Sequence, residues 1–165
     1  RYPTAYEDRY GYNNGPRSSP VVDGNRVFSI GAEGKFHALD LETGEMLWRR
    51  DFRTEYGATQ DFFGVSSSPL VERDVVIVNV GGVDEACVVG FDTTTGRERW
   101  RAGHWGPSYA SPVPATIHGQ RRVFVFAGGE SNPPEGGLMS VDPVTGRVDF
   151  SVSHRSRTYA HHSRT

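Results

Sequence analysis

The stretch that decides the fold is DLETGEMLW at residues 40–48, because its pattern returns twice further along the chain. The second copy is DTTTGRERW at residues 92–100, and the third is DPVTGRVDF at residues 142–150. The motif positions are Asp40, Thr43, Gly44, Trp48, Asp92, Thr95, Gly96, Trp100, Asp142, Thr145, Gly146 and Phe150. The chain is therefore built from repeats.

A second element recurs with nearly the same period. A Ser-Pro pair precedes a valine-containing segment at Ser19-Pro20, Ser68-Pro69 and Ser111-Pro112. The motif aspartates at 40, 92 and 142 are 52 and 50 residues apart. Self-similarity at about 40–50 residues, carried by short strand-like segments, indicates a propeller or a solenoid.

Each repeat has the pattern of four short strands. In the first copy they fall at residues 18–22, 26–30, 35–40 and 45–49, with glycine-containing turns between them. Four strands per repeat make a blade of a β-propeller, and no stretch has helical periodicity. We therefore predict an all-β fold of about three four-stranded antiparallel blades in a single domain, residues 1–165. The blades are expected at 17–50, 66–102 and 110–152, with 1–16 and 153–165 connecting to missing blades.

The motif residues have structural roles that outweigh a catalytic one. The glycines are expected to supply positive φ in the turn between the third and fourth strands. The aspartate and threonine side chains are expected to accept hydrogen bonds from backbone N–H groups in the same turn. The terminal ring is expected to pack against the neighbouring blade.

Composition excludes several classes of protein. The net charge is −2 and there is no basic block, so nothing favours nucleic-acid binding. The longest nearly uncharged apolar run covers residues 75–83, far short of the roughly 20 residues of a membrane span. The single cysteine, Cys87, excludes an intrachain disulfide and a cysteine zinc cluster, and we predict that it is buried. No metal ligands are predicted.

The pattern Ala38-x-Asp40-x-x-Thr43-Gly44-x-x-x-Trp48 resembles the tryptophan-docking repeat of PQQ-like, or quinoprotein alcohol dehydrogenase-like, β-propeller proteins. That family includes PQQ-dependent dehydrogenases, BamB-type propellers and uncharacterised bacterial members, which the Ser-Pro and Asp-Gly features most resemble. The resemblance covers about residues 17–152 and implies a ring of seven or eight blades. The remaining blades of the parent chain are then partners of this segment.

The resemblance implies three alternative functions. The first is a non-catalytic scaffold that binds a protein or an extended ligand, and the second is a segment of a PQQ-dependent dehydrogenase. The third is a carbohydrate-active or lyase-type propeller. Dehydrogenases of the family carry adjacent cysteines near the quinone, which one cysteine cannot supply. We therefore favour a protein that is not an enzyme and predict no cofactor in this segment; the enzyme alternative is a PQQ-dependent oxidoreductase, in which PQQ with calcium would bind only to the full-length protein. Relatives are mostly exported, which implies a periplasmic or cell-surface location.

Any ligand is expected on the face that gathers the long loops, at residues 6–17, 51–65, 81–86, 102–109 and 128–137. These loops combine aromatic rings with carboxylates, which suits a sugar, a peptide or a quinone. The alternative is that the rings pack the loops onto the blades. The candidate ligand contacts are Trp105, Tyr109, Tyr56, Asp61, Arg17 and Glu130.

Overall fold

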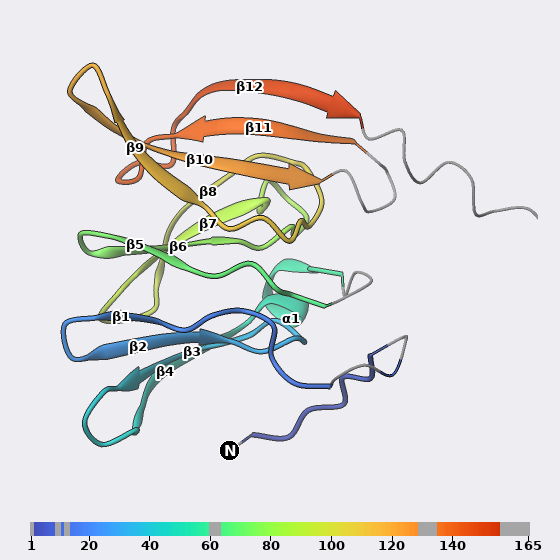
Figure 1. Ribbon diagram of the computed structural model, residues 1–165, viewed down its shortest axis with the longest axis vertical. Helices are drawn as coiled ribbons and strands as arrows, with labels where there is room; N and C mark the ends of the chain where they lie inside the picture. Colours follow the sequence, from blue (N-terminus) through green and yellow to red (C-terminus); the bar gives the residue numbers. More distant parts are fainter. Residues whose placement is uncertain (1, 9–10, 12–13, 60–63, 129–134, 156–165) are drawn as a thin grey trace, which may run out of the picture.

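The computed structural model describes residues 2–8, 11, 14–59, 64–128 and 135–155. Within them the chain forms three four-stranded antiparallel sheets, stacked one after another (Figure 1). Blade 1 comprises β1 Val21–Asp23, β2 Arg26–Ile30, β3 Lys35–Asp40 and β4 Met46–Asp51. Blade 2 comprises β5 Leu70–Glu72, β6 Val75–Asn79, β7 Val88–Asp92 and β8 Glu98–Ala102. Blade 3 comprises β9 Val113–Ile117, β10 Gln120–Gly128, β11 Glu135–Val141 and β12 Val148–Arg155. The predicted fold class is confirmed.

The turn between the third and fourth strands is built by the side chains of its own motif. In blade 2, Oδ1 of Asp92 accepts hydrogen bonds from the N–H groups of Thr94 (3.0 Å) and Thr95 (2.8 Å) and from the Thr95 hydroxyl (2.9 Å). Gly96 takes a φ of 67°, in the left-handed region that glycine enters without strain. The Arg99 guanidinium and these turn donors hold the pKa of Asp92 well below its usual range. Side chains of the motif therefore satisfy backbone donors of their own turn.

The tryptophan that ends each of the first two motifs joins one blade to the next. The indole N–H of Trp48 donates to the carbonyl oxygen of Thr93 at 3.1 Å, and that of Trp100 donates to Pro143 at 3.1 Å. A Cβ on Gly96 would lie 2.5 Å from Cδ2 of Trp48, and one on Gly146 would lie 2.6 Å from Cδ2 of Trp100. The turn glycine therefore also makes room for the ring of the preceding blade.

Two hydrophobic clusters fill the spaces between the blades. Because successive side chains of a strand point to opposite faces, blade 2 contributes to both clusters. Between blades 1 and 2 lie Phe28, Ile30, Phe36, Phe52, Tyr56, Val76, Val78, Val89 and Phe91, among others. Between blades 2 and 3 lie Val75, Ile77, Cys87, Val88, Trp100, Trp105, Val123, Val125 and Met139, among others. Burial of Cys87 is confirmed, and it raises the pKa of the thiol to about 12.

The Ser-Pro pairs connect the first strands of successive blades. The backbone N–H of Ser19 donates to the hydroxyl of Ser68 at 2.9 Å, and the N–H of Ser68 donates to the hydroxyl of Ser111 at 2.9 Å. Proline follows each serine, so the next residue offers no N–H group. The serine hydroxyl of one blade thus accepts a hydrogen bond from the last backbone N–H group before the first strand of the preceding blade.

One element contradicts the expectation of no helix. Phe52–Tyr56 forms the short helix α1 in the connection between blades 1 and 2. Asp51 caps it by accepting from the N–H groups of Arg53 and Thr54, and Gly57 ends it at a φ of 61°. Five residues are too few to show helical periodicity, so only the caps could have predicted this turn. No helix among the described residues is long and apolar enough to cross a membrane.

Candidate functional site

The long connections gather at one end of the stacked sheets. Figure 1 shows α1, the leader before blade 1 and the connections between blades at this end, and the short turns at the other. We call this end the loop face. The leader comprises residues 2–8 together with the described residues up to Arg17. Rigid strands beneath such loops fix their positions, which is the arrangement that binding sites commonly use.

A hollow of about 220 Å³ opens on the loop face between blades 2 and 3. Four glycines line it, together with Thr59, Val83, His104, Trp105, Pro107 and Glu135. A Cβ on Gly82 would lie 2.6 Å from the carbonyl oxygen of Tyr56, so the wall requires glycine there. We call this the Trp105 hollow. Its exposed polar side chains are Thr59, His104 and Glu135.

Two of the predicted ligand contacts are buried. Trp105 is 6% exposed and belongs to the hydrophobic cluster between blades 2 and 3, although it also borders the Trp105 hollow. Tyr56 is 5% exposed, and its hydroxyl donates to Glu98 at 2.9 Å. Burial and the Glu98 carboxylate raise the pKa of Tyr56. The Arg101 guanidinium lies 5.5 Å from the centre of the Tyr56 ring, so both the ring and the hydroxyl of Tyr56 are engaged within the fold.

The other predicted contacts do not form one cluster with these. Arg17 pairs with Asp8 at 3.1 Å in the leader, where a hydrogen bond to Tyr6 raises the pKa of Arg17. Tyr109 is half-buried and is engaged in a contact within the protein. Asp61 and Glu130 lie outside the described residues. The structure therefore brings Trp105 and the end of α1 to one hollow and leaves Arg17 with the leader.

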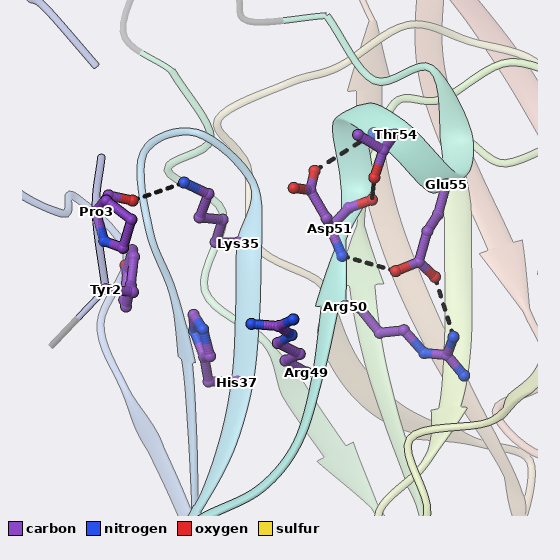
Figure 2. A pocket seen from close by; sticks show the side chains of 9 residues that line it. All are labelled: Tyr2, Pro3, Lys35, His37, Arg49, Arg50, Asp51, Thr54 and Glu55. Atoms are coloured by element: carbon purple, nitrogen blue, oxygen red, sulfur yellow. Dashed lines mark hydrogen bonds and ion pairs between the residues drawn. The ribbon is translucent and has the colours of Figure 1, made fainter. Parts of the chain in front are cut away.

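A second hollow was not predicted from the sequence. It measures about 420 Å³ and lies on the side of blade 1 that faces away from blade 2. Its lining residues are Tyr2, Pro3, Lys35, His37, Arg49, Arg50, Asp51, Thr54 and Glu55, which come from the leader, β3, β4 and α1 (Figure 2). We call it the flank hollow. Four separate segments build it, which is why no local motif predicts it.

Metal chemistry finds no support among the described residues, because no group of three His, Cys, Asp or Glu side chains lies close enough together to hold an ion. Cys87 is alone and buried. Two of the acidic side chains near the loop face are engaged in ion pairs, Glu98 with Arg101 at 2.8 Å and Asp8 with Arg17 at 3.1 Å.

Comparison with known families settles the class of protein. A family model described as outer membrane protein assembly factor BamB matches residues 8–162. The chain belongs to this family. The predicted membership among PQQ-like β-propeller repeats is confirmed.

The chain spans less than a third of the length of the curated relatives that it matches, which are BamB proteins and quinoproteins. BamB of Alkalilimnicola ehrlichii is 31% identical over 114 residues, which is 66% of this chain and 29% of the relative. Quinohemoprotein alcohol dehydrogenase ADH-IIG of Pseudomonas putida is 28% identical over 72 residues, 42% of this chain and 10% of the relative. The crystal structure of BamB from Moraxella catarrhalis has a TM-score of 0.56 at 21% identity, covering 83% of this chain and 38% of that one. The structural likeness shows a partial propeller, which implies other blades.

Proposed function

We propose that this BamB-family segment belongs to a non-catalytic propeller whose loop face binds a protein or another extended ligand. The observation that carries the proposal is the Trp105 hollow. Four glycines line it, and its exposed polar side chains, Thr59, His104 and Glu135, offer a hydroxyl, an imidazole and a carboxylate. Glycines along a groove let an extended chain approach closely, and exposed polar side chains at its rim can fix the position of that chain.

The relatives' names support a place in the cell envelope. An outer membrane protein assembly factor and a quinohemoprotein dehydrogenase both point there by analogy. The finer proposal is a periplasmic or cell-surface location. A scaffold in that place would hold other proteins rather than transform a small substrate.

The dehydrogenase alternative is favoured by the match to ADH-IIG. PQQ with calcium would require oxygen ligands for the metal and the adjacent cysteines expected near the quinone. The residues of this segment do not fit that requirement, because Cys87 is single and no metal-holding group occurs among the described residues. We derive no catalytic step through the quinone. The carbohydrate alternative depends on exposed rings, and burial of Trp105 and Tyr56 counts against it, whereas Tyr109 is half-buried.

Site-specific crosslinking in the whole protein tests the scaffold proposal. A photoreactive residue at His104, on the rim of the Trp105 hollow, is expected to trap one protein partner in cells. A photoreactive residue at Thr94, in the short turn at the other end of blade 2, is the matched control. Trapping from both positions alike, or from neither, would contradict the proposal.

Calorimetric titration of the whole protein with PQQ and calcium distinguishes the alternative. The scaffold proposal predicts no binding and no dye-coupled alcohol oxidation. Stoichiometric binding with turnover would make the segment part of a dehydrogenase ring.

A further inference from the structure

The Trp105 hollow is built from segments that are already packed together. Its wall comes from the connection between β6 and β7, from the connection between blades 2 and 3, from the residues after α1 and from the start of β11. Glu135 at the start of β11 has the same strand parity as Met139, whose side chain is buried between blades 2 and 3. The hollow therefore lies over the junction of two blades, and a further blade on either outward side of the stack leaves it open.

The floor of the hollow is apolar. Four glycines, Val83, Trp105 and Pro107 supply most of its lining. Val83 is 57% exposed, and a Cβ on Gly57 would lie 3.1 Å from its Cγ2 atom, so glycine allows the two connections to meet here. A floor of glycine and apolar side chains admits the close approach of another backbone.

A four-residue turn with two carboxylates stands at the rim of the hollow, directly after Val83. The N–H of Ala86 donates to the carbonyl oxygen of Val83 at 3.0 Å, and Asp84 and Glu85 between them have φ values of 53° and 63°. Turns with two residues in the left-handed region usually contain Asn-Gly. Both acidic side chains are exposed, and neither carboxylate has a hydrogen bond or ion pair with a residue that the structure describes. The turn thus presents two carboxylates to solvent at positions where asparagine and glycine would be less strained.

The charges around the hollow do not cancel. Nε and Nη2 of Arg101 donate to Glu98 at 2.8 Å and 2.9 Å, so these two charges balance. The two arginines and two acidic residues of 50–55 also balance. Glu135 lies opposite Arg155 in the register of β11 and β12, which adds one charge of each sign. The two carboxylates of the turn are left over, and the rim is therefore negative.

We propose that the extended ligand of the Trp105 hollow is a basic peptide segment, whose lysine or arginine side chains pair with Asp84 and Glu85. This inference rests on the proposed function of the loop face and names the chemistry of its partner. The apolar floor accommodates the backbone and small side chains of the segment. Alternate side chains of an extended chain point away from that floor, within reach of the rim. An acidic segment would meet uncompensated like charges there.

A fluorescently labelled peptide of alternating lysine and threonine tests the inference on the whole protein, because threonine favours an extended backbone. The readout is fluorescence anisotropy at fixed ionic strength, and a peptide of alternating glutamate and threonine is the matched probe. We expect saturable binding of the lysine peptide that weakens as salt is added, and no saturable binding of the glutamate peptide. Equal binding of the two peptides, or no saturable binding of the lysine peptide, would overturn the inference.

The decisive variant carries Asp84→Asn together with Glu85→Gln. It is expected to weaken binding of the lysine peptide by about three- to tenfold, because two exposed ion pairs are lost. Both replacements keep the size of the side chain, and asparagine tolerates the left-handed region, so the turn is retained. The matched control, Glu42→Gln together with Glu45→Gln, removes the same charge from an exposed turn at the other end of blade 1. Equal weakening by the two double variants would contradict the role given to the rim.

Photocrosslinking from His104 separates a failure of this inference from a failure of the proposed function. A partner that is trapped less efficiently once Asp84→Asn and Glu85→Gln are introduced supports the basic segment. Unchanged trapping in that background would mean that the loop face binds a protein but that the rim carboxylates do not recognise it. If His104 traps no partner in the parent protein, the proposed function and this inference both fail.

Discussion

The two outward sides of the stacked blades have opposite chemistry. The side of blade 1 that faces away from blade 2 carries Ser29, Lys35, His37 and Arg49, and the leader lies on it. The side of blade 3 that faces away from blade 2 carries the apolar row Phe126–Leu138–Val152 and the row Phe124–Ser140–Phe150, in which two of the three residues are aromatic. Phe126, Phe150 and Val152 are 44%, 45% and 59% exposed.

This difference indicates which side is suited to contact with another blade. The apolar side of blade 3 has the character of the interfaces that already join the three blades, so it is the side suited to another blade. The polar side of blade 1 is contacted by the leader, through the stacking of Tyr2 on His37 and the hydrogen bond from Lys35 to Pro3. Two copies of the chain would therefore not close head to tail through a matched apolar interface.

The largest expected effect comes from the ring that ends each motif. Trp100→Ala removes a buried indole and its hydrogen bond to Pro143, which is expected to cost about 3–5 kcal/mol of unfolding free energy. Phe150→Ala, at the equivalent position of blade 3, is expected to cost less than about 1 kcal/mol in the 165-residue chain. Urea denaturation of both variants measures the difference. Equal losses would mean that the blade 3 side is already covered.

The turn glycines give the next largest effect. Gly44→Ala strains a residue at a φ of 72° with nothing within 4 Å, and about 1–2 kcal/mol is expected from the left-handed backbone alone. Gly96→Ala adds a clash with Trp48 and is expected to cost about 1–3 kcal/mol more. Thermal unfolding compares the two. If Gly44→Ala lowered the unfolding free energy as much as Gly96→Ala, the result would indicate that an aromatic ring also packs against Gly44, contrary to this account.

The Ser-Pro pairs provide a smaller contrast. Ser68→Ala leaves the N–H of Ser19 without its acceptor and is expected to cost about 1 kcal/mol. Ser19→Ala removes a hydroxyl that has no partner within the described residues, and its expected effect is within about 0.5 kcal/mol. Chemical denaturation distinguishes them, and a reversed order would disprove the role given to the serine hydroxyls.

The smallest effect is a pH dependence at His37. Burial, then the charges of Arg49 and Lys35, lower its pKa from 6.5, so the folded state binds a proton less readily than the unfolded state. Stability from neutral His37 is present above about pH 6.5 and declines as the pH falls through the folded pKa. We expect His37→Val to lose less stability than the parent between pH 8 and pH 5. Replacement of exposed His104 by Gln is the control, and an unchanged slope in His37→Val would refute the assignment.

Much of the fold could be predicted because its signals are local. Asp92, Thr95 and Gly96 close their turn with hydrogen bonds among themselves, so the motif predicts the turn wherever it occurs. Helix α1 escaped prediction because five residues show no period. β12 continues to Arg155, three residues past the predicted end of its blade, and no local residue marks that end.

The candidate site was harder to predict than the fold. Trp105 and Tyr56 were chosen as rings in long loops, but a ring that packs inward has the same sequence signal as one that meets a ligand. The flank hollow needs residues from four segments, which only the fold brings together. The sequence did contain one signal of a polar surface here, because an alignment of the repeats places Ser29 and His37 at the positions that Val78 and Val89 occupy in blade 2.

Cysteine labelling in the whole protein tests most directly whether the two outward sides differ. Native Cys87 is buried with a thiol pKa of about 12, so it gives little background reaction. Arg49→Cys and Val152→Cys each place one thiol on one outward side. The account predicts rapid reaction with a maleimide at position 49 and protection at position 152. Protection at 49 with rapid reaction at 152 would contradict it.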